Sequence, residues 1–247
     1  KKQIAEAKLY RGLSYFYLVR YFGGLQIATK ISDYEEITGQ PRASVEEVYD
    51  QIIADLKAAQ EGLPGRSEQP AGRPFKEVAT GFLAKVYLTM GGQPLEQTEM
   101  FAQAATEAEK VIDNEEDYPL FDSYTEAFSE AAQNSGEQML AIQTYGPGGG
   151  FWYPSNKRLP FTPYCVDFVQ AFSPDDQRKE VTFWPFFDYG KPVDVDTVEV
   201  GQEADDKLFC GKYRTDPNFV DDKPNWPVLR YAEVLLIHAE AENEVNG

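Results

Sequence analysis

Three consecutive aromatic residues, Phe151, Trp152 and Tyr153, stand in the stretch YGPGGGFWYPSN at positions 145–156. Sugar rings present flat faces rich in C–H groups that pack on aromatic rings, and sugar hydroxyls need amide or carboxylate partners. Asn156 supplies such an amide, and the glycines allow the loop to bend. These residues are therefore the first ligand-binding candidates, with Trp152 preferred. The alternative is a loop whose aromatics fold back to cover neighbouring helices.

A second aromatic group surrounds Pro185 and includes Trp184. A group this dense is more typical of an edge packed on a scaffold, but Trp184 remains a ligand-binding candidate. The aromatic members of the group are Phe183, Trp184, Phe186, Phe187 and Tyr189. Phe161 and Tyr164 are weaker candidates of the same kind.

Acidic residues gather between positions 194 and 206. Calcium prefers oxygen ligands, but the D-x-D spacing here lacks the central glycine and terminal glutamate of the twelve-residue calcium loop. We therefore expect a solvated acidic loop and no metal at Asp194, Asp196, Glu199, Asp205 and Asp206. Cys165 and Cys210 form one disulfide or none, and two separated thiols do not support a zinc site.

Catalytic chemistry has little support in this sequence. His238 is the only histidine, it lies in a helical stretch, and no G-x-S-x-G motif accompanies it, so a Ser-His-Asp triad is not indicated. The 41 acidic residues guarantee some pairs at the separation that glycoside hydrolysis needs, so such pairs carry no information. We expect no catalytic residue and no cofactor.

Composition narrows the class of partner. Lys and Arg number 23 against 41 Asp and Glu, for a net charge of −18, which repels phosphate backbones and argues against nucleic acid. No apolar run approaches the roughly 20 residues of a membrane span. Aromatic residues make up 14% of the chain, which is more than a helical core requires, so we expect some of them to face a ligand.

The scaffold that must position these residues begins with a helix from Ala5 to Phe22. One apolar stripe recurs at three- and four-residue spacing, and a second stripe of tyrosines lies about a quarter-turn away, so we expect this helix to lie between neighbours. The first stripe is Ala5, Leu9, Leu13 and Phe16, and the second is Tyr10, Tyr17 and Tyr21. Gly23 and Gly24 end the helix.

Four further helices are predicted along the chain. Ser44 and Glu47 form a capping box at the start of a helix that stops at Leu63. Helices from Pro74 to Met90 and from Pro94 to Ile112 form an antiparallel hairpin. The last helix starts at Pro227, and we expect its apolar face to need a partner beyond the end of this chain.

The helical alternation resembles degenerate tetratricopeptide repeats, so the predicted fold is mostly α, with helix pairs as a scaffold and long irregular loops. We expect one domain over residues 1–247, with a helical part (1–112), a loop-rich part (113–226) and a returning helix (227–247). The chain starts in mid-helix without a cap, an initiator Met, a signal peptide or a lipobox-like cysteine, so we expect a piece of a longer protein.

Four stretches together resemble the SusD/RagB family of outer-membrane lipoproteins of Bacteroidota. They are AEAKLYRGLSYFYLVRYFGGLQIAT from Ala5, PRASVEEVYDQIIADLKAAQEGLP from Pro41, GRPFKEVATGFLAKVYLTMGG from Gly72 and NWPVLRYAEVLLIHAEAENEVNG from Asn225. FSPDDQRKEVTF is similar to that family's segment with a D-x-R-[RK] core.

The resemblance implies a lipid-anchored, surface-exposed outer-membrane protein that binds an oligo- or polysaccharide and delivers it to a SusC-like TonB-dependent transporter. It implies no enzymatic activity. The alternative is a helical-repeat adaptor that binds peptides or proteins and has no small-molecule site. A glycoside hydrolase is a third hypothesis, and it would require turnover.

Overall fold

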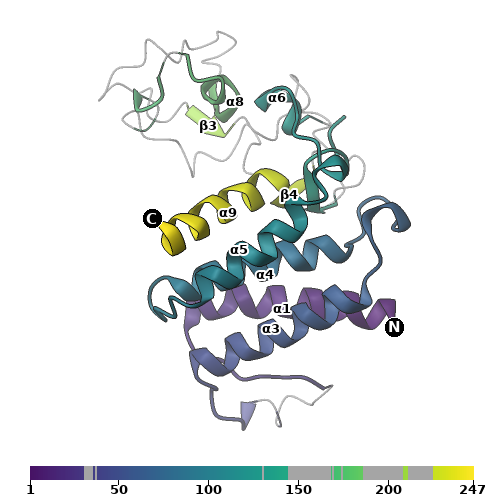
Figure 1. Ribbon diagram of the computed structural model, residues 1–247, viewed down its shortest axis with the longest axis vertical. Helices are drawn as coiled ribbons and strands as arrows, with labels where there is room; N and C mark the ends of the chain where they lie inside the picture. Colours follow the sequence, from purple (N-terminus) through teal and green to yellow (C-terminus); the bar gives the residue numbers. More distant parts are fainter. Residues whose placement is uncertain are drawn as a thin grey trace. The chain divides into compact units, whose positions relative to one another are not determined.

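The computed structural model describes residues 1–30, 36, 38–129, 131–143, 168, 170–173, 175–185, 208–210 and 225–247 (Figure 1). The chain forms two compact units. The first combines Lys1–Pro119 with Leu229–Gly247, and the second is Leu120–Val228. The division into parts at residues 112 and 226 stays a prediction.

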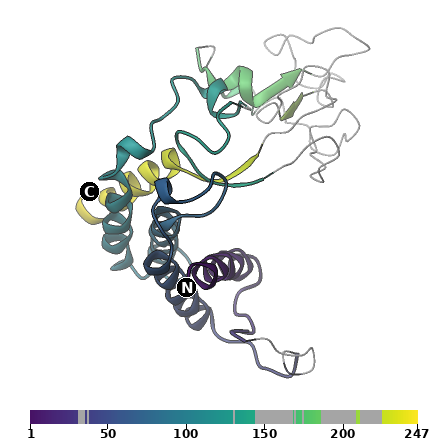
Figure 2. The same ribbon diagram turned by 90° about the vertical axis from the view of Figure 1, so that its right-hand side faces the viewer.

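The first unit is helical, which confirms the mostly α fold. Its helices are α1 (Lys2–Phe22), α3 (Val45–Gly62), α4 (Lys76–Gly91), α5 (Met100–Ile112) and α9 (Tyr231–Asn246), with the short 3-10 helices η1 (Arg66–Glu68) and η2 (Glu115–Asp117). Each helix packs on the next: α1 on α3, α3 on α4, α4 on α5 and α5 on α9. Figure 2 shows these helices side by side.

The capping box at the start of α3 is confirmed. Ser44 Oγ accepts the Glu47 backbone N–H at 3.2 Å, and Glu47 Oε2 accepts the Ser44 backbone N–H at 2.8 Å. Two amide groups that the helix itself leaves unpaired are thereby satisfied. The glycine stop of α1 also holds, since Gly23 adopts a φ of +71°, which favours glycine.

Two predicted helix starts are wrong. Helix α5 begins at Met100 and not at Pro94, because the preceding residues form a turn in which Gln97 N–H donates to Met90 O at 3.0 Å. Helix α9 begins at Tyr231 and not at Pro227, because the intervening residues form a strand. Both errors come from reading apolar spacing across a segment whose backbone pairs elsewhere.

The two stripes of α1 have different surroundings. Ala5, Leu9 and Phe16 are buried in the unit where α1 packs on α3, as predicted. Tyr10 and Tyr21 are 45% and 78% exposed, so the described residues do not cover the second stripe as we expected.

The last helix finds its partners within the chain. Tyr231, Val234, Ile237 and Ala241 are buried, and α9 packs on α5 and, less extensively, on α4. The expectation that its apolar face needs a partner beyond residue 247 is therefore wrong. The α4–α5 hairpin supplies the surface that this face requires.

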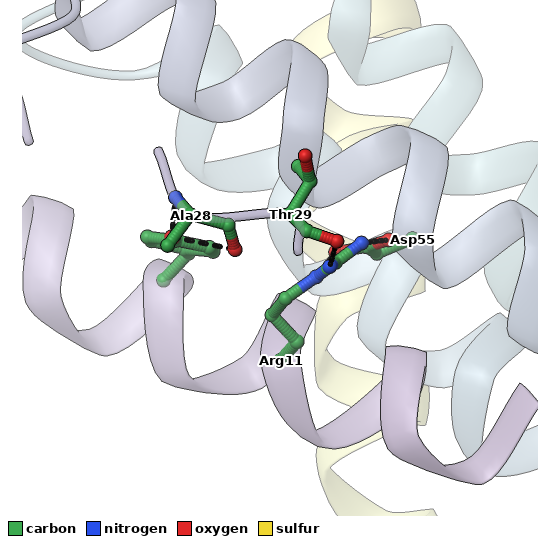
Figure 3. Close-up of polar contacts among 5 residues, drawn as sticks. Arg11, Ala28, Thr29 and Asp55 are labelled. Carbon is green, nitrogen blue, oxygen red and sulfur yellow. Dashed lines mark hydrogen bonds and ion pairs between the residues drawn. The ribbon is translucent and has the colours of Figure 1, made fainter. Parts of the chain in front are cut away.

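A buried ion pair joins α1 to α3 (Figure 3). Arg11 Nε and Nη2 each donate to the Asp55 carboxylate at 2.7 Å, and the Asp55 side chain is only 2% exposed. Arg11 Nη1 also donates to Thr29 O at 3.1 Å, and Ala28 N–H donates to Tyr15 Oη at 2.7 Å. The pair therefore fixes both the helix packing and the first part of the α1–α3 connector.

The connector folds back on itself beside the end of α1. Ala43 N–H donates to Leu25 O at 2.8 Å, and Gln26 Nε2 donates to Gln40 O at 2.7 Å. Gly24 lies so close to this pairing that a Cβ there would stand 2.2 Å from Ala43 O. Only glycine fits such a close backbone approach.

The second unit contains short elements. They are α6 (Tyr124–Ala127), β1 (Gln138–Ile142), α8 (Arg178–Thr182), β2 (Phe183–Pro185), β3 (Leu208–Cys210) and β4 (Trp226–Arg230), the last of which crosses the division between the units. Strand β1 pairs with β4, and β2 pairs antiparallel with β3. Two separate two-stranded sheets thus give this unit its regular backbone pairing.

Candidate functional site

Most of the predicted ligand-binding residues lie outside the described residues. These are Phe151, Trp152, Tyr153 and Asn156, together with the weaker candidates Phe161 and Tyr164. The acidic loop between 194 and 206 and Cys165 also lie outside. Trp184 is in β2, where its Cα pairs with that of Phe209 in β3. Their assignment as ligand-binding residues stays a prediction.

The D-x-R-K segment forms a local charged turn at the start of α8. Asp176 Oδ1 accepts the Arg178 backbone N–H at 2.9 Å, and Arg178 Nη2 donates to Asp176 Oδ2 at 2.6 Å. These Arg178 hydrogen bonds hold the pKa of Asp176 at about 2, well below its usual range. The Arg178 guanidinium also lies 5.7 Å from the centre of the Phe172 ring. Both charges are used within the turn, which indicates a structural role.

A cluster of three amide side chains, which we call the amide clasp, lies next to the predicted ligand segment. It consists of Asn134, Gln143 and Asn225. Asn134 and Gln143 exchange two reciprocal hydrogen bonds, with Asn134 Nδ2 to Gln143 Oε1 at 2.8 Å and Gln143 Nε2 to Asn134 Oδ1 at 2.9 Å. Asn225 Nδ2 donates to Gln143 Oε1 at 2.9 Å. Residues distant in sequence thus meet through one side chain.

Exposed apolar side chains flank the amide clasp along the chain. Trp226 follows Asn225 and is 38% exposed, and Ile142 precedes Gln143 and is also exposed. A half-exposed indole beside fixed amides is a usual combination for stacking on a sugar ring. Sequence reasoning missed Trp226, because it was counted within a helix; the Asn-Trp-Pro run before the arginine is the signal that marks a strand start instead.

An aromatic stack, formed by Phe75, Tyr118 and Tyr231, occupies the interior of the first unit. Tyr118 lies between the other two rings, with centroids 6.1 Å from Phe75 and 5.8 Å from Tyr231. The Arg66 guanidinium lies 5.1 Å from the Tyr118 centroid, and Arg66 Nη1 donates to Asp117 O at 2.8 Å. Sequence analysis did not single out these residues, which come from four separate segments.

The hydroxyl of Tyr118 is buried without a hydrogen-bond partner in the described structure, and so is Oε2 of Glu77. Burial raises the pKa of Tyr118 well above its usual range, and the negative charge of Glu77 raises it further. Tyr118 therefore stays neutral and acts as a packing residue. No acid-base role follows from this position.

Other chemistry finds no constellation among the described residues. His238 is half-buried on α9. Within the described ranges, no group of three or more His, Cys, Asp or Glu side chains could hold a metal ion. In the same part of the chain, no helix is both long and apolar enough to cross a membrane.

Two family models match the chain. Residues 1–88 match the model SusD-like_3, described as starch-binding and associating with the outer membrane. Residues 79–247 match the model of the SusD family. The two matches together extend over the whole sequence.

Individual proteins give the same result. The SusD-like protein P2 of Formosa agariphila is 30% identical over 98% of this chain and 52% of its own length. The crystal structure of a SusD superfamily protein from Parabacteroides distasonis is 29% identical, with a TM-score of 0.74 over 98% of this chain and 55% of that one. A crystal structure with xylogluco-oligosaccharide is 26% identical, with a TM-score of 0.68 over 97% and 54%. The chain spans about half the length of the curated relatives it matches.

Proposed function

The chain belongs to the SusD family, and on that premise we propose that it takes part in capturing an oligo- or polysaccharide at the cell surface. The captured glycan is then delivered to a SusC-like TonB-dependent outer-membrane transporter. The protein acts at the outer membrane, exposed on the cell surface and held there by a lipid anchor. It binds without chemical turnover and needs no cofactor.

The observation that carries this proposal is the family match along the whole chain, which includes a model described as starch-binding. The similar structure with xylogluco-oligosaccharide supports a glycan as the class of ligand. The sequence adds the aromatic residues Phe151, Trp152, Tyr153 and Trp184, and the structure adds the half-exposed Trp226. Affinity then comes from stacking and a few hydrogen bonds on a polar ligand, so we expect micromolar binding.

Isothermal titration against a panel of soluble polysaccharides, including starch and xyloglucan oligosaccharides, tests the proposal. We expect saturable binding to one of them and a loss of about tenfold in affinity for Trp152→Ala, with smaller losses for Trp184→Ala and Trp226→Ala. Tyr21→Ala is the matched control, because Tyr21 is an exposed aromatic on α1 in the first unit. Silence of the wild-type protein across the panel would refute the glycan proposal.

The adaptor remains a second candidate, because α1 exposes an aromatic surface at Tyr10, Tyr21 and Phe22. It predicts that no polysaccharide binds and that Tyr21→Ala weakens the complex with the protein partner. A hydrolase predicts products from labelled oligosaccharides incubated with the protein. We expect no such products.

A further inference from the structure

The amide clasp of Asn134, Gln143 and Asn225 joins the two ends of the segment that carries every predicted ligand-binding residue. Gln143 comes directly before position 144, and Asn225 directly after position 224. We propose that Gln143 and Asn225 are positioning residues for glycan binding, which hold these two ends together and so fix where the ligand-binding stretch starts and finishes. This inference rests on the proposed function.

The hydrogen bonds of Gln143 show that its side chain works within the protein. Its Oε1 accepts from Asn134 Nδ2 and Asn225 Nδ2, and its Nε2 donates to Asn134 Oδ1 and to Ala141 O at 3.0 Å. A glutamine amide has two protons to donate and two lone pairs that accept, so all four positions are used. Although Gln143 is exposed, it therefore serves as the centre of a network and not as a free ligand contact.

Asn225 brings the far end of the segment to this network. It is 4% exposed, and its bond to Gln143 spans 82 positions of sequence. A buried amide that loses its partner carries the full cost of desolvation, so this contact has a strong requirement for a donor at position 225. The pairing of β1 with β4 joins the same two stretches of chain through the backbone.

Asn134 is suited to its place by both backbone and side chain. Its φ is +59°, a left-handed conformation that asparagine tolerates better than most residues other than glycine. Its backbone N–H donates to Gln138 Oε1 at 3.2 Å while its side chain pairs with Gln143. The clasp is thus tied to the strand β1 on one side and to the start of β4 on the other.

The consequence for binding is entropic. Bringing together the ends of a long segment has a closure cost, and a ligand that must itself order the segment binds more weakly by that amount. A clasp formed before the ligand arrives removes this cost from the binding step. Its loss should therefore weaken binding even if every ligand-contacting side chain is intact.

Asn225→Asp is the sharpest test, because aspartate has nearly the size and shape of asparagine but its carboxylate cannot donate to Gln143 Oε1. With the polysaccharide that binds the wild-type protein, we expect the Kd to rise about tenfold for Asn225→Asp and about threefold for Asn225→Ala and Gln143→Ala. Gln103→Ala is the control, since it removes an exposed amide on α5 in the first unit.

Hydrogen exchange provides a readout that does not depend on a ligand. We expect faster exchange of the β1 and β4 amides in Asn225→Asp, with unchanged exchange in α3 and α4. A simple packing role would instead tolerate Asp and penalise Ala. Affinity and exchange equal to wild type in Asn225→Asp would overturn the inference.

The outcomes separate the two proposals. If the wild-type protein binds no polysaccharide, the proposed function fails, while altered exchange would still establish that the clasp joins these two strands. If the wild-type protein binds and Asn225→Asp binds equally well, the positioning role fails while the proposed function stands.

Discussion

Replacing Arg11 with methionine probes the energetic weight of the ion pair that joins α1 to α3. Methionine keeps the length and apolar body of the side chain but removes the guanidinium. Asp55 then keeps a charge in a site where its side chain is only 2% exposed, and it loses both of its 2.7 Å hydrogen bonds. Thr29 O loses its 3.1 Å donor as well.

The expected cost follows from this asymmetry. Breaking a buried pair by removing one partner costs about 3–5 kcal/mol, and we expect the lower end because the Arg11 side chain is 29% exposed. Asp55→Leu should cost less, about 2 kcal/mol, since the remaining guanidinium can reach water. The double variant Arg11→Met/Asp55→Leu leaves no unpaired charge, so we expect it to be more stable than Arg11→Met alone.

Urea unfolding followed by circular dichroism at 222 nm measures these differences. The midpoint should fall for Arg11→Met without a change of slope. Lys30→Met is the control, because its ion pair with Glu36 is exposed and should be worth no more than about 0.5 kcal/mol. If Arg11→Met costs less than Asp55→Leu, or no more than the control, the buried carboxylate does not depend on Arg11 and the reasoning is refuted.

Three further predictions concern other contacts. Tyr118→Phe should stabilise the protein by about 1 kcal/mol, because the buried hydroxyl has no partner in the described structure. The raised pKa of Tyr118 means that the native state keeps a proton that the unfolded chain loses above pH 10, so wild-type stability should fall there by about 1.4 kcal/mol per pH unit, and Tyr118→Phe should lack this loss in urea titrations from pH 8 to 11. Gly24→Ala should lower the thermal midpoint through its clash with Ala43 O, whereas Gly65→Ala, which meets nothing within 4 Å, should not. Ser44→Ala should cost about 1 kcal/mol by loss of the α3 cap, and an unchanged urea midpoint would contradict the capping role.

The elements that the sequence predicted well depend on neighbours close along the chain. The α3 capping box joins residues three apart, and the buried stripe of α1 recurs every three or four residues. The glycine stop after Phe22 likewise needs only the local backbone. Each of these features is written within one or two helical turns, and the family resemblance extended them to the whole scaffold.

The errors arose where the deciding partner is distant. Apolar spacing could not tell that residues 226–230 pair with β1 and so delay the start of α9. It also could not tell which face of α1 meets α3, and the tyrosine stripe stayed exposed. For the candidate site, aromatic type and loop composition identified Trp152 and Trp184, but they passed over Trp226 because its surroundings depend on strand pairing.

By itself, the sequence determined the family, the helical scaffold and the aromatic residue types available for a ligand, because these depend on composition, motif and local period. Only the tertiary structure decided that Arg11 belongs with Asp55, that Tyr118 stacks between Phe75 and Tyr231, and that Gln143 holds Asn225 across 82 positions. The physical reason is that hydrogen bonds and ring contacts act over a few ångströms, and the fold alone brings such distant residues within that range.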